Sequence, residues 1–300
     1  MFSCQLVANR RSVGMEFTEK VVLITGASSG IGAACAVRFA RASAKLSLVG
    51  RNKENLEKVA ELCETASESH PLTIIGDITS EEDVKRIVTT TIDHYGRIDV
   101  LVNNAGITLM ASIQDGVEPL DRIMTTNVRG TYLLTHHVIP YLVLTRGNIV
   151  NVSSVLSTTP MTCMTPYCMS KAALDCLTKC LALELASKGV RVNAVNPGPV
   201  KTNLFTRAGL SSEFSDALFA SFSAALPLKK ICECEDVAEL VTYLGSDKAS
   251  SITGSCVVMD CGVSLGDSEK KIEIRSESAA EHRSQTTTKN ELTEKFIAIS

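Results

Sequence analysis

The sequence predicts an α/β fold: one doubly wound parallel sheet with helices on both of its faces. Short apolar runs alternate with longer segments of helical period from Lys20 to Gly262, and each apolar run is continuous rather than alternating. Strands of a parallel sheet are buried on both faces and give such continuous runs, and right-handed crossover helices join them. No linker-like stretch interrupts the pattern, so we expect a single domain over residues 16–266.

The elements can be assigned in chain order from their apolar period. The first strand, at residues 21–24, is a compact run rich in β-branched residues that leads into several glycines and a helical stretch ending at Arg41. Six further strands are expected at residues 45–49, 72–75, 99–102, 147–152, 190–195 and 255–259. Later helices are expected at residues 55–65, 119–142, 165–187 and 236–244.

The helix after residue 80 has the clearest ends. Ser80 is a favourable N-cap, and the three acidic residues that follow it complement the helix dipole. Apolar residues then recur every three or four positions as far as Ile92, and Gly96 is expected to end the helix.

Three segments fall outside this alternation. Residues 202–226 lack strand-like runs yet carry six larger apolar residues, Leu204, Phe205, Phe214, Leu218, Phe219 and Phe222. Their concentration favours a mobile helical lid over an apolar substrate, with two packed surface helices as the alternative. Residues 1–15 are expected to form a short flexible leader, and residues 267–300, which mix charges with Ser and Thr, a disordered tail.

The composition excludes several classes of protein. Apolar residues make up 45% of the 300 residues, which is enough for a sizeable core, and the net charge of −3 gives no electrostatic case for nucleic acid or an anionic membrane. The sequence also lacks the run of roughly 18 apolar residues that an integral membrane span needs.

The cysteines indicate a reducing compartment. There are 11 of them, an odd number at irregular spacing, which favours free thiols and a cytoplasmic location. Cys232 and Cys234 form a C-x-C pair with no second Cys or His pair nearby, so no metal site is predicted. Arg10 and Arg11 lie in an acid-free N-terminus similar to a transit peptide, which leaves a mitochondrial location as the alternative.

A glycine-rich turn, Thr25-Gly26-Ala27-Ser28-Ser29-Gly30-Ile31-Gly32, follows the first strand. Glycines at such a turn let the backbone approach a pyrophosphate, and the next helix offers N–H groups and the positive end of its dipole. The spacing is G-x-x-x-G-x-G rather than the commoner G-x-G-x-x-G. Its position predicts a dinucleotide site formed by Gly26, Ser28, Ser29, Gly30, Ile31 and Gly32.

Tyr167 and Lys171 stand four residues apart on a predicted helix, so their side chains share one face. Ser154 lies thirteen residues before Tyr167, at the end of a predicted strand, and ligands bind at strand carboxyl ends in such sheets. A phenol is a weak acid and base at neutral pH, and a neighbouring ammonium group lowers its pKa. A Y-x-x-x-K pair occurs by chance in many helices and by itself would be structural, but its place near this strand end predicts that Tyr167 exchanges a proton with a substrate, assisted by Lys171.

Taken together, these motifs resemble the short-chain dehydrogenase/reductase family. The glycine-rich turn, Asn103-Asn104-Ala105-Gly106 after the fourth strand and Tyr167-x-x-x-Lys171 follow one another in the family's order. The resemblance covers residues 16–262 and is greatest to the branch of 3-oxoacyl carrier-protein reductases and carbonyl reductases. It implies a Rossmann-type fold and a nicotinamide cofactor.

The resemblance also assigns individual residues. Ser154 would orient the substrate carbonyl, while its neighbour Ser153 would point to the other face of an extended segment. Asn127 would hold a water that links Lys171 to solvent. The implied cofactor contacts are Asp77 and Ile78 beside the adenine, Asn104, Ala105 and Gly106 with Tyr167 and Lys171 at the nicotinamide ribose, and Pro197, Gly198, Val200 and Thr202 at the carboxamide.

The turn after the second strand bears on the choice of cofactor. An acid there accepts a hydrogen bond from the ribose 2′-hydroxyl of NAD, whereas a cation pairs with the 2′-phosphate of NADP. Arg51 and Asn52 follow the strand and no acid stands at the turn, which favours NADP(H). Glu54 could neutralise Arg51, so NAD(H) stays open.

The combined expectation is an NADP(H)-dependent oxidoreductase that interconverts a carbonyl and a secondary alcohol. Its substrate is expected to be small and fairly apolar, and by resemblance the chain assembles as a homodimer or homotetramer. An NAD-dependent alcohol dehydrogenase and a regulatory protein that binds NADP(H) without turnover are the alternatives. Ser43 and Cys261 stand where the family usually has glycine.

Overall fold

The computed structural model describes residues 16–67, 69–202 and 211–266. It contains one parallel sheet with the strand order β3-β2-β1-β4-β5-β6-β7. The strands are β1 (Val21–Thr25), β2 (Lys45–Gly50), β3 (Leu72–Ile75), β4 (Val100–Asn103), β5 (Asn148–Val152), β6 (Arg191–Pro197) and β7 (Cys256–Met259). The predicted fold class is confirmed, and each predicted strand lies within about one to two residues of its observed bounds.

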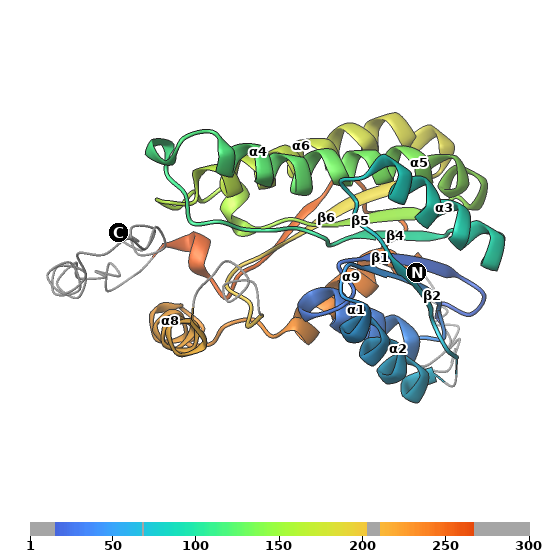
Figure 1. Cartoon of the computed structure of the whole chain (residues 1–300), viewed down its shortest axis with the longest axis horizontal. Coiled ribbons are helices and arrows are strands. Elements are labelled where there is room, and N and C mark those ends of the chain that lie inside the picture. Colours follow the sequence, from blue (N-terminus) through green and yellow to red (C-terminus); the bar gives the residue numbers. More distant parts are fainter. Residues whose placement is uncertain (1–15, 68, 203–210, 267–300) are drawn as a thin grey trace, which may run out of the picture.

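Helices cover both faces of the sheet (Figure 1). One layer consists of α1 (Gly30–Arg41), α2 (Lys53–Ser67) and α9 (Cys234–Gly245). The opposite layer consists of α3 (Glu81–Tyr95), α4 (Glu118–Met124), α5 (Thr131–Thr145) and α6 (Thr165–Leu185). No helix in the described part of the chain is both long and apolar enough to cross a lipid bilayer.

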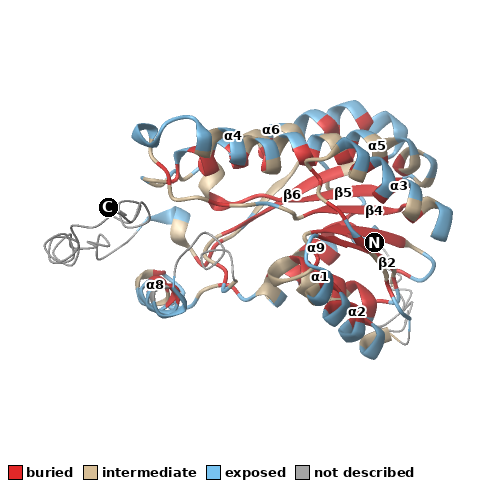
Figure 2. Ribbon diagram, in the orientation of Figure 1, coloured by how far each residue is buried: buried red, intermediate tan, exposed pale blue. Residues whose placement is uncertain are grey.

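The inner strands β1, β2, β4, β5 and β6 are buried on both faces, as their continuous apolar runs predict, whereas the edge strands β3 and β7 are partly exposed (Figure 2). Side chains alternate between the faces, so Val22 and Ile24 of β1 pack in the core beneath α1, α2 and α9. Leu23 of the same strand packs in the opposite core, beneath α3, α5 and α6. Strand β1 therefore packs against both helical layers.

Helix α3 has the predicted ends. The Ser80 hydroxyl accepts a hydrogen bond from the Asp83 N–H at 3.3 Å, and Gly96 ends the helix in the left-handed conformation with φ 74°. Val84 and Ile87 are fully buried on its inner face.

The long helix predicted at residues 119–142 is interrupted. A π-helical turn over Thr125–Gly130 separates α4 from α5. A period of 3.6 residues does not reveal the wider turn, and such turns are frequent at functional sites. It brings Gly130 against Ile78, where an added Cβ would lie 3.0 Å from the isoleucine side chain. Asn127 lies inside this turn.

Residues 211–226 are described and residues 203–210 are not, so part of the predicted lid lies outside the described residues. Helix α8 (Ser212–Ala225) stands apart from both helical layers in Figure 1. Its Leu218, Phe219 and Phe222 pack together with Ile231. The predicted leader at 1–15 and the tail at 267–300 also lie outside the described residues.

Candidate functional site

The predicted site residues follow the carboxyl ends of six neighbouring strands. The segments after β1, β2 and β3 carry the glycine-rich turn, Arg51 and Asp77, and those after β4, β5 and β6 carry Asn104, Ser154 and the Pro197–Thr202 loop. β1 pairs with both β2 and β4, so the connections leave the middle of the sheet in opposite directions. In an open α/β sheet this switch point opens a crevice in which ligands bind.

The glycine-rich turn has the backbone shape that its glycines permit. Gly26 and Gly30 have φ 64° and 57°, values that residues with a side chain rarely adopt. A Cβ on Gly32 would collide with the Gly26 carbonyl, so the turn closes tightly onto the start of α1. A Cβ on Gly30 would instead face the Thr202 side chain at 3.5 Å. The glycine-rich turn and the loop after β6 therefore face each other.

Thr25 and Asn104 tie the first turn to the segment after β4. The Thr25 hydroxyl accepts hydrogen bonds from the N–H groups of Asn104 and Ala105, both at 3.0 Å. The Asn104 amide donates to the carbonyls of Thr25 at 3.0 Å and Gly26 at 3.2 Å. The two segments expected to hold the pyrophosphate and the nicotinamide ribose are thus one hydrogen-bonded unit.

These features fit a dinucleotide. A glycine-lined turn at the start of a helix offers backbone N–H groups and the positive end of the helix dipole to a phosphate group. The residues that would hold it are those of the turn from Gly26 to Gly32, including Ser28, Ser29 and Ile31.

The turn after β2 brings a cation to the edge of this site. Arg51 is largely exposed and lies 3.4 Å from the Asp77 carboxylate, which also accepts hydrogen bonds from Thr79. Asn52 uses its side-chain oxygen to cap α2 by accepting from the Asn55 N–H at 2.8 Å. Glu54 pairs with Lys58 at 2.7 Å rather than with Arg51.

Tyr167, Ser154 and Lys171 come together at the end of β5. Tyr167 is hydrogen-bonded to the Ser154 side chain, and the Ser154 hydroxyl also accepts from the Leu156 N–H at 3.1 Å. The Lys171 ammonium lies 5.5 Å from the centre of the Tyr167 ring and donates to the Val152 carbonyl at 2.9 Å. All three side chains are buried.

Burial dominates the acidity of this group. It raises the pKa of Tyr167 to about 12, opposed by the hydrogen bond with Ser154. It lowers the pKa of Lys171 to about 8, opposed by the negative charge of Asp175. Contrary to the expectation from the helix spacing alone, desolvation outweighs any help that the ammonium gives the phenolate, so Tyr167 is a protonated phenol at neutral pH.

Asn127 is fixed by the backbone. Its side chain accepts from the Ile107 N–H at 2.8 Å and donates to the Ile107 carbonyl at 2.9 Å. Its amide also donates to the Ser170 hydroxyl at 3.1 Å. A Cβ on Gly106 would lie 3.2 Å from the Asn127 oxygen and 3.8 Å from the Lys171 nitrogen, so these three residues meet.

The loop after β6 packs against two later segments of the chain, one at Asp260 after β7 and one at Cys232 before α9. Gly198 packs so closely on Asp260 that an added Cβ would lie 2.8 Å from the Asp260 Cα. Val200 pairs with Cys232 as an isolated bridge. Pro197, Val200 and Thr202 are thereby held opposite the glycine-rich turn.

Four residues of the site were not assigned roles from the sequence. Thr25 joins the first two segments, and the Ser153 hydroxyl lies 3.2 Å from the Lys171 carbonyl oxygen, to which it donates. Asp175 and Asn196 are buried behind Ser154 and hydrogen-bonded to each other at 2.7 Å. The spacing of Tyr167, Lys171 and Asp175 at every fourth position could have indicated Asp175.

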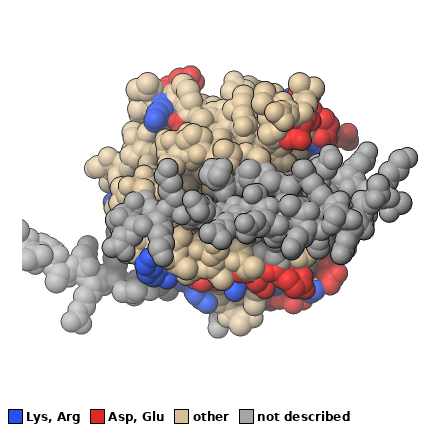
Figure 3. All heavy atoms as spheres, turned by 90° about the vertical axis from the view of Figure 1, so that its left-hand side faces the viewer, with Lys and Arg blue, Asp and Glu red and all other residues tan. Residues whose placement is uncertain are grey.

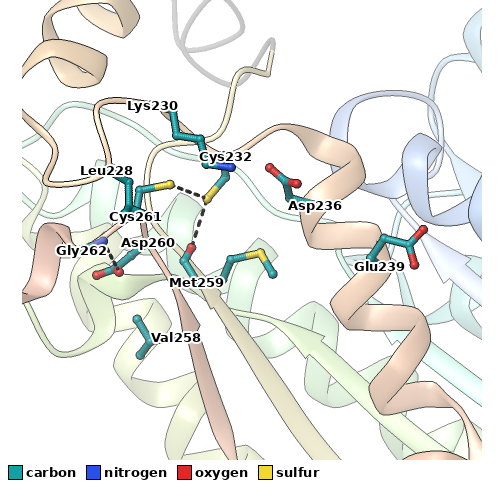
Figure 4. A pocket seen from close by; sticks show the side chains of 10 residues that line it. All are labelled: Leu228, Lys230, Cys232, Asp236, Glu239, Val258, Met259, Asp260, Cys261 and Gly262. Carbon is teal, nitrogen blue, oxygen red and sulfur yellow. Dashed lines mark hydrogen bonds between the residues drawn. The ribbon is translucent and has the colours of Figure 1, made fainter.

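A separate cavity of about 560 Å³ lies between α9 and the end of β7 (Figure 4). Cys232 and Cys261 line it with their sulfur atoms 3.5 Å apart. None of its lining residues belongs to the predicted site. Among the described residues, no group of three or more His, Cys, Asp or Glu side chains could hold a metal ion.

Among the described residues on the face turned to the reader in Figure 3, those without charge predominate. Basic and acidic side chains both appear along its upper and lower edges, so neither sign dominates the visible, described part of this face.

Comparison with known proteins gives the family. Residues 26–264 match the family described as enoyl-(acyl carrier protein) reductase. A solved short-chain dehydrogenase/reductase of unknown function from Caenorhabditis elegans, determined with its cofactor, has a TM-score of 0.80 and 32% identity over 83% of this chain and 97% of that chain. This chain belongs to the short-chain dehydrogenase/reductase family. It is therefore related to oxidoreductases that bind NAD(P).

Two curated relatives differ in the reactions their names describe. Glucose 1-dehydrogenase of Gluconobacter oxydans is 37% identical over 84% of this chain and 95% of its own length. The 3-oxoacyl-[acyl-carrier-protein] reductase of Thermotoga maritima is 35% identical over 83% of this chain and 99% of its own length. The short-chain dehydrogenase/reductase fold and family are thus confirmed, while sugar and acyl substrates both occur among similar proteins.

Proposed function

We propose that this short-chain dehydrogenase/reductase interconverts a carbonyl and a secondary alcohol with NADP(H), using Tyr167 as the general acid and base. The observation that carries the proposal is the buried group formed by Tyr167, Ser154 and Lys171 beside a glycine-lined turn. A protein that only senses NADP(H) has no need of a buried proton donor at that point.

The chemistry is divided between cofactor and chain. A bound nicotinamide supplies the hydride for the carbonyl carbon, or accepts it in the reverse direction. The phenol of Tyr167 gives its proton to the substrate oxygen during reduction and takes it back during oxidation. Because the pKa of Tyr167 is raised to about 12, the proton is present on the phenol at neutral pH.

Ser154 and Lys171 assist that proton transfer. The Ser154 hydroxyl, held by the Leu156 N–H, donates a hydrogen bond to the substrate oxygen as negative charge develops there. Lys171 brings a positive charge beside the phenol and stabilises the phenolate that forms when Tyr167 loses its proton. Asn127, next to Lys171 and Gly106, holds the water through which Lys171 exchanges protons with solvent.

The NADP preference rests on Arg51. Its guanidinium is exposed at the end of β2, and its contact with Asp77 is long at 3.4 Å, so it can turn toward a 2′-phosphate. Asn52 completes this end of the site, although its oxygen is already used to cap α2.

The substrate is proposed to be fairly apolar. The surroundings of Tyr167 are formed by Ile107, Leu109, Met110, Leu156, Met161 and Met164. This wall favours a hydrophobic substrate body with its carbonyl turned to Ser154 and Tyr167. Residues 202–226 are proposed to act as the lid, because Thr202 adjoins the glycine-rich turn and α8 continues from that loop.

The test is cofactor consumption with a panel of ketones, aldehydes and acetoacetyl thioesters, each supplied with NADPH or NADH. We expect at least one apolar ketone to be reduced, with a kcat/KM about tenfold higher for NADPH than for NADH. Turnover with NADH alone would favour the NAD-dependent dehydrogenase. Tight NADPH binding without any turnover would favour a regulatory protein.

A further inference from the structure

We propose that Asp175 is a positioning residue of this site: its buried carboxylate keeps Lys171 charged and, through Asn196, holds the segment that carries Ser154. The inference rests on the proposed function, since it assigns Asp175 a part in the same proton transfer. It goes beyond that function because Asp175 touches neither the carbonyl nor the phenol.

Helix α6 presents three ionisable side chains in register. Tyr167, Lys171 and Asp175 are spaced by four residues, so each lies slightly more than one helical turn, or about 6 Å along the axis, after the last. All three are buried, and only 6% of Asp175 is exposed. The helix thus directs a phenol, an ammonium and a carboxylate toward the sheet in a single row.

Asn196 connects this row to the catalytic serine. At the end of β6, its amide nitrogen lies 2.7 Å from an Asp175 carboxylate oxygen, 2.9 Å from the Ser157 hydroxyl and 3.1 Å from the Ser154 carbonyl. Asp175 is the only charged acceptor of the three, and a charged acceptor forms the stronger hydrogen bond. Asp175 therefore fixes the amide that holds both ends of the turn following Ser154.

The negative charge of the carboxylate also acts on Lys171, one helical turn earlier on α6. Burial lowers the pKa of Lys171, and the negative charge of Asp175 is the opposing influence. The other titratable groups around these side chains are Tyr167, Cys168 and the exposed Lys179 on α6 and Cys256 on β7. Burial raises the pKa of Tyr167 and of Cys256, so both are neutral near neutral pH, and Asp175 supplies the negative charge that opposes the effect of burial on Lys171.

The unsatisfied atoms argue against a purely structural role. In the described part of the chain, the side-chain oxygen of Asn196 has no hydrogen-bond partner, and the side-chain donors to the Asp175 carboxylate are the Asn196 amide and the Cys256 thiol, which is a weak donor. A buried carboxylate with so few donors destabilises a fold compared with a neutral residue of the same size. An asparagine or leucine at this position would give a more stable fold, so the presence of a charged residue favours a role in the reaction.

Two substitutions separate the two parts of the role. Asp175→Asn keeps an acceptor for Asn196 and removes the charge, whereas Asp175→Leu removes both. NADPH affinity would be followed by the fluorescence of the bound cofactor between about pH 7 and 10, and kcat and KM would be measured over the same range. Binding needs no substrate, so this readout is independent of turnover.

We expect Asp175→Asn to move the alkaline loss of NADPH affinity and of kcat down by about one pH unit, because Lys171 loses the nearby negative charge that favours its ammonium form. Asp175→Leu should show the same shift and an additional loss of kcat of about tenfold, with KM changed less, because Ser154 is no longer held. Thermal unfolding of each variant checks that it is folded.

Thr178→Val is the matched control. Thr178 is fully buried one turn further along α6 and accepts a hydrogen bond from Asn151 at 2.8 Å, yet it carries no charge. It should lower stability and leave the pH dependence unchanged. The inference is overturned if Asp175→Asn shifts the profile by less than about 0.2 pH unit, or if Thr178→Val shifts it equally. Failure of the wild type to bind NADPH or NADH would overturn the proposed function as well.

Discussion

Tyr167 and Lys171 have pKa values moved in opposite directions by the same burial. With a pKa of about 12 for the phenol and about 8 for the ammonium, both groups are largely protonated at about pH 7 and below. A protonated phenol beside a cation suits reduction, in which the phenol gives up a proton and the resulting charge needs a partner.

The pH dependence of reduction follows from this pair. Lys171 loses its charge as the pH rises through about 8, so kcat/KM for carbonyl reduction should fall by about tenfold per pH unit above that value. Alcohol oxidation needs the phenolate and should rise toward alkaline pH over the range in which Lys171 is still charged. Initial rates in both directions from about pH 6 to 10 measure this, and a reduction rate that climbs steadily above pH 9 would contradict it.

Arg51 makes the cofactor preference testable at a single residue. Arg51→Ala should raise the KM for NADPH by about tenfold or more and leave that for NADH within about twofold, because only NADP carries the 2′-phosphate. Lys58→Ala is the control, since Lys58 is an exposed cation of α2 that pairs with Glu54. Equal effects of Arg51→Ala on both cofactors would argue against the assignment.

At the scale of elements, the connection between α1 and β2 carries a side chain in an unfavourable conformation. Ser43 has φ 65°, where glycine is the favoured residue. Ser43→Gly and Ser43→Ala both remove the hydroxyl, and only alanine keeps a Cβ in the left-handed region. The glycine variant should therefore be more stable than the alanine variant by about 1 kcal/mol in urea unfolding, and an alanine variant of equal or greater stability would contradict this.

The elements also show how far the sequence could be interpreted. Apolar runs and the signals around Ser80 and Gly96 predict strands and helix ends, because burial and capping act over a few residues. The π-helical turn at Asn127 was not predicted, since it follows from contacts such as that between Gly130 and Ile78. Motif spacing identified Tyr167 and Lys171 as candidate catalytic residues. Their pKa values depend on how deeply the side chains are buried, which the spacing of a motif does not reveal.

The contact between Asp175 and Asn196 was also not predicted from the sequence. They lie 21 residues apart on α6 and β6, and only the parallel pairing of β5 with β6 brings the asparagine behind Ser154. Neighbouring strands and helices are predictable from the sequence, whereas the hydrogen bonds between their side chains depend on register and packing.

At the scale of the whole molecule, apolar side chains remain exposed on the helical layer that contains α5 and α6. Tyr132 and Leu144 of α5 and Met169 and Leu183 of α6 are all exposed, Leu183 at 83%. Large exposed apolar residues on two helices of one layer favour an interface, in line with the proposed homodimer or homotetramer.

The oligomer can be tested with a matched pair of substitutions. Leu183→Asp should shift the mass measured by light scattering toward the monomer, because a charge is buried poorly in an apolar interface. Leu62→Asp, at a leucine that is also exposed but lies on α2 in the opposite layer, should leave the mass unchanged. A monomeric wild type, or an effect of Leu62→Asp alone, would contradict an interface on α6.

The central claim is that Tyr167 is the proton donor of a nicotinamide-dependent carbonyl reductase. The most direct measurement compares wild type, Tyr167→Phe and the exposed control Tyr243→Phe on α9 in NADPH binding and in reduction of the best ketone of the panel. Tyr167→Phe should bind NADPH within about threefold of wild type and lose about a thousandfold in kcat, while Tyr243→Phe matches wild type in both. A Tyr167→Phe variant that reduces the ketone within about tenfold of the wild-type rate would contradict the account.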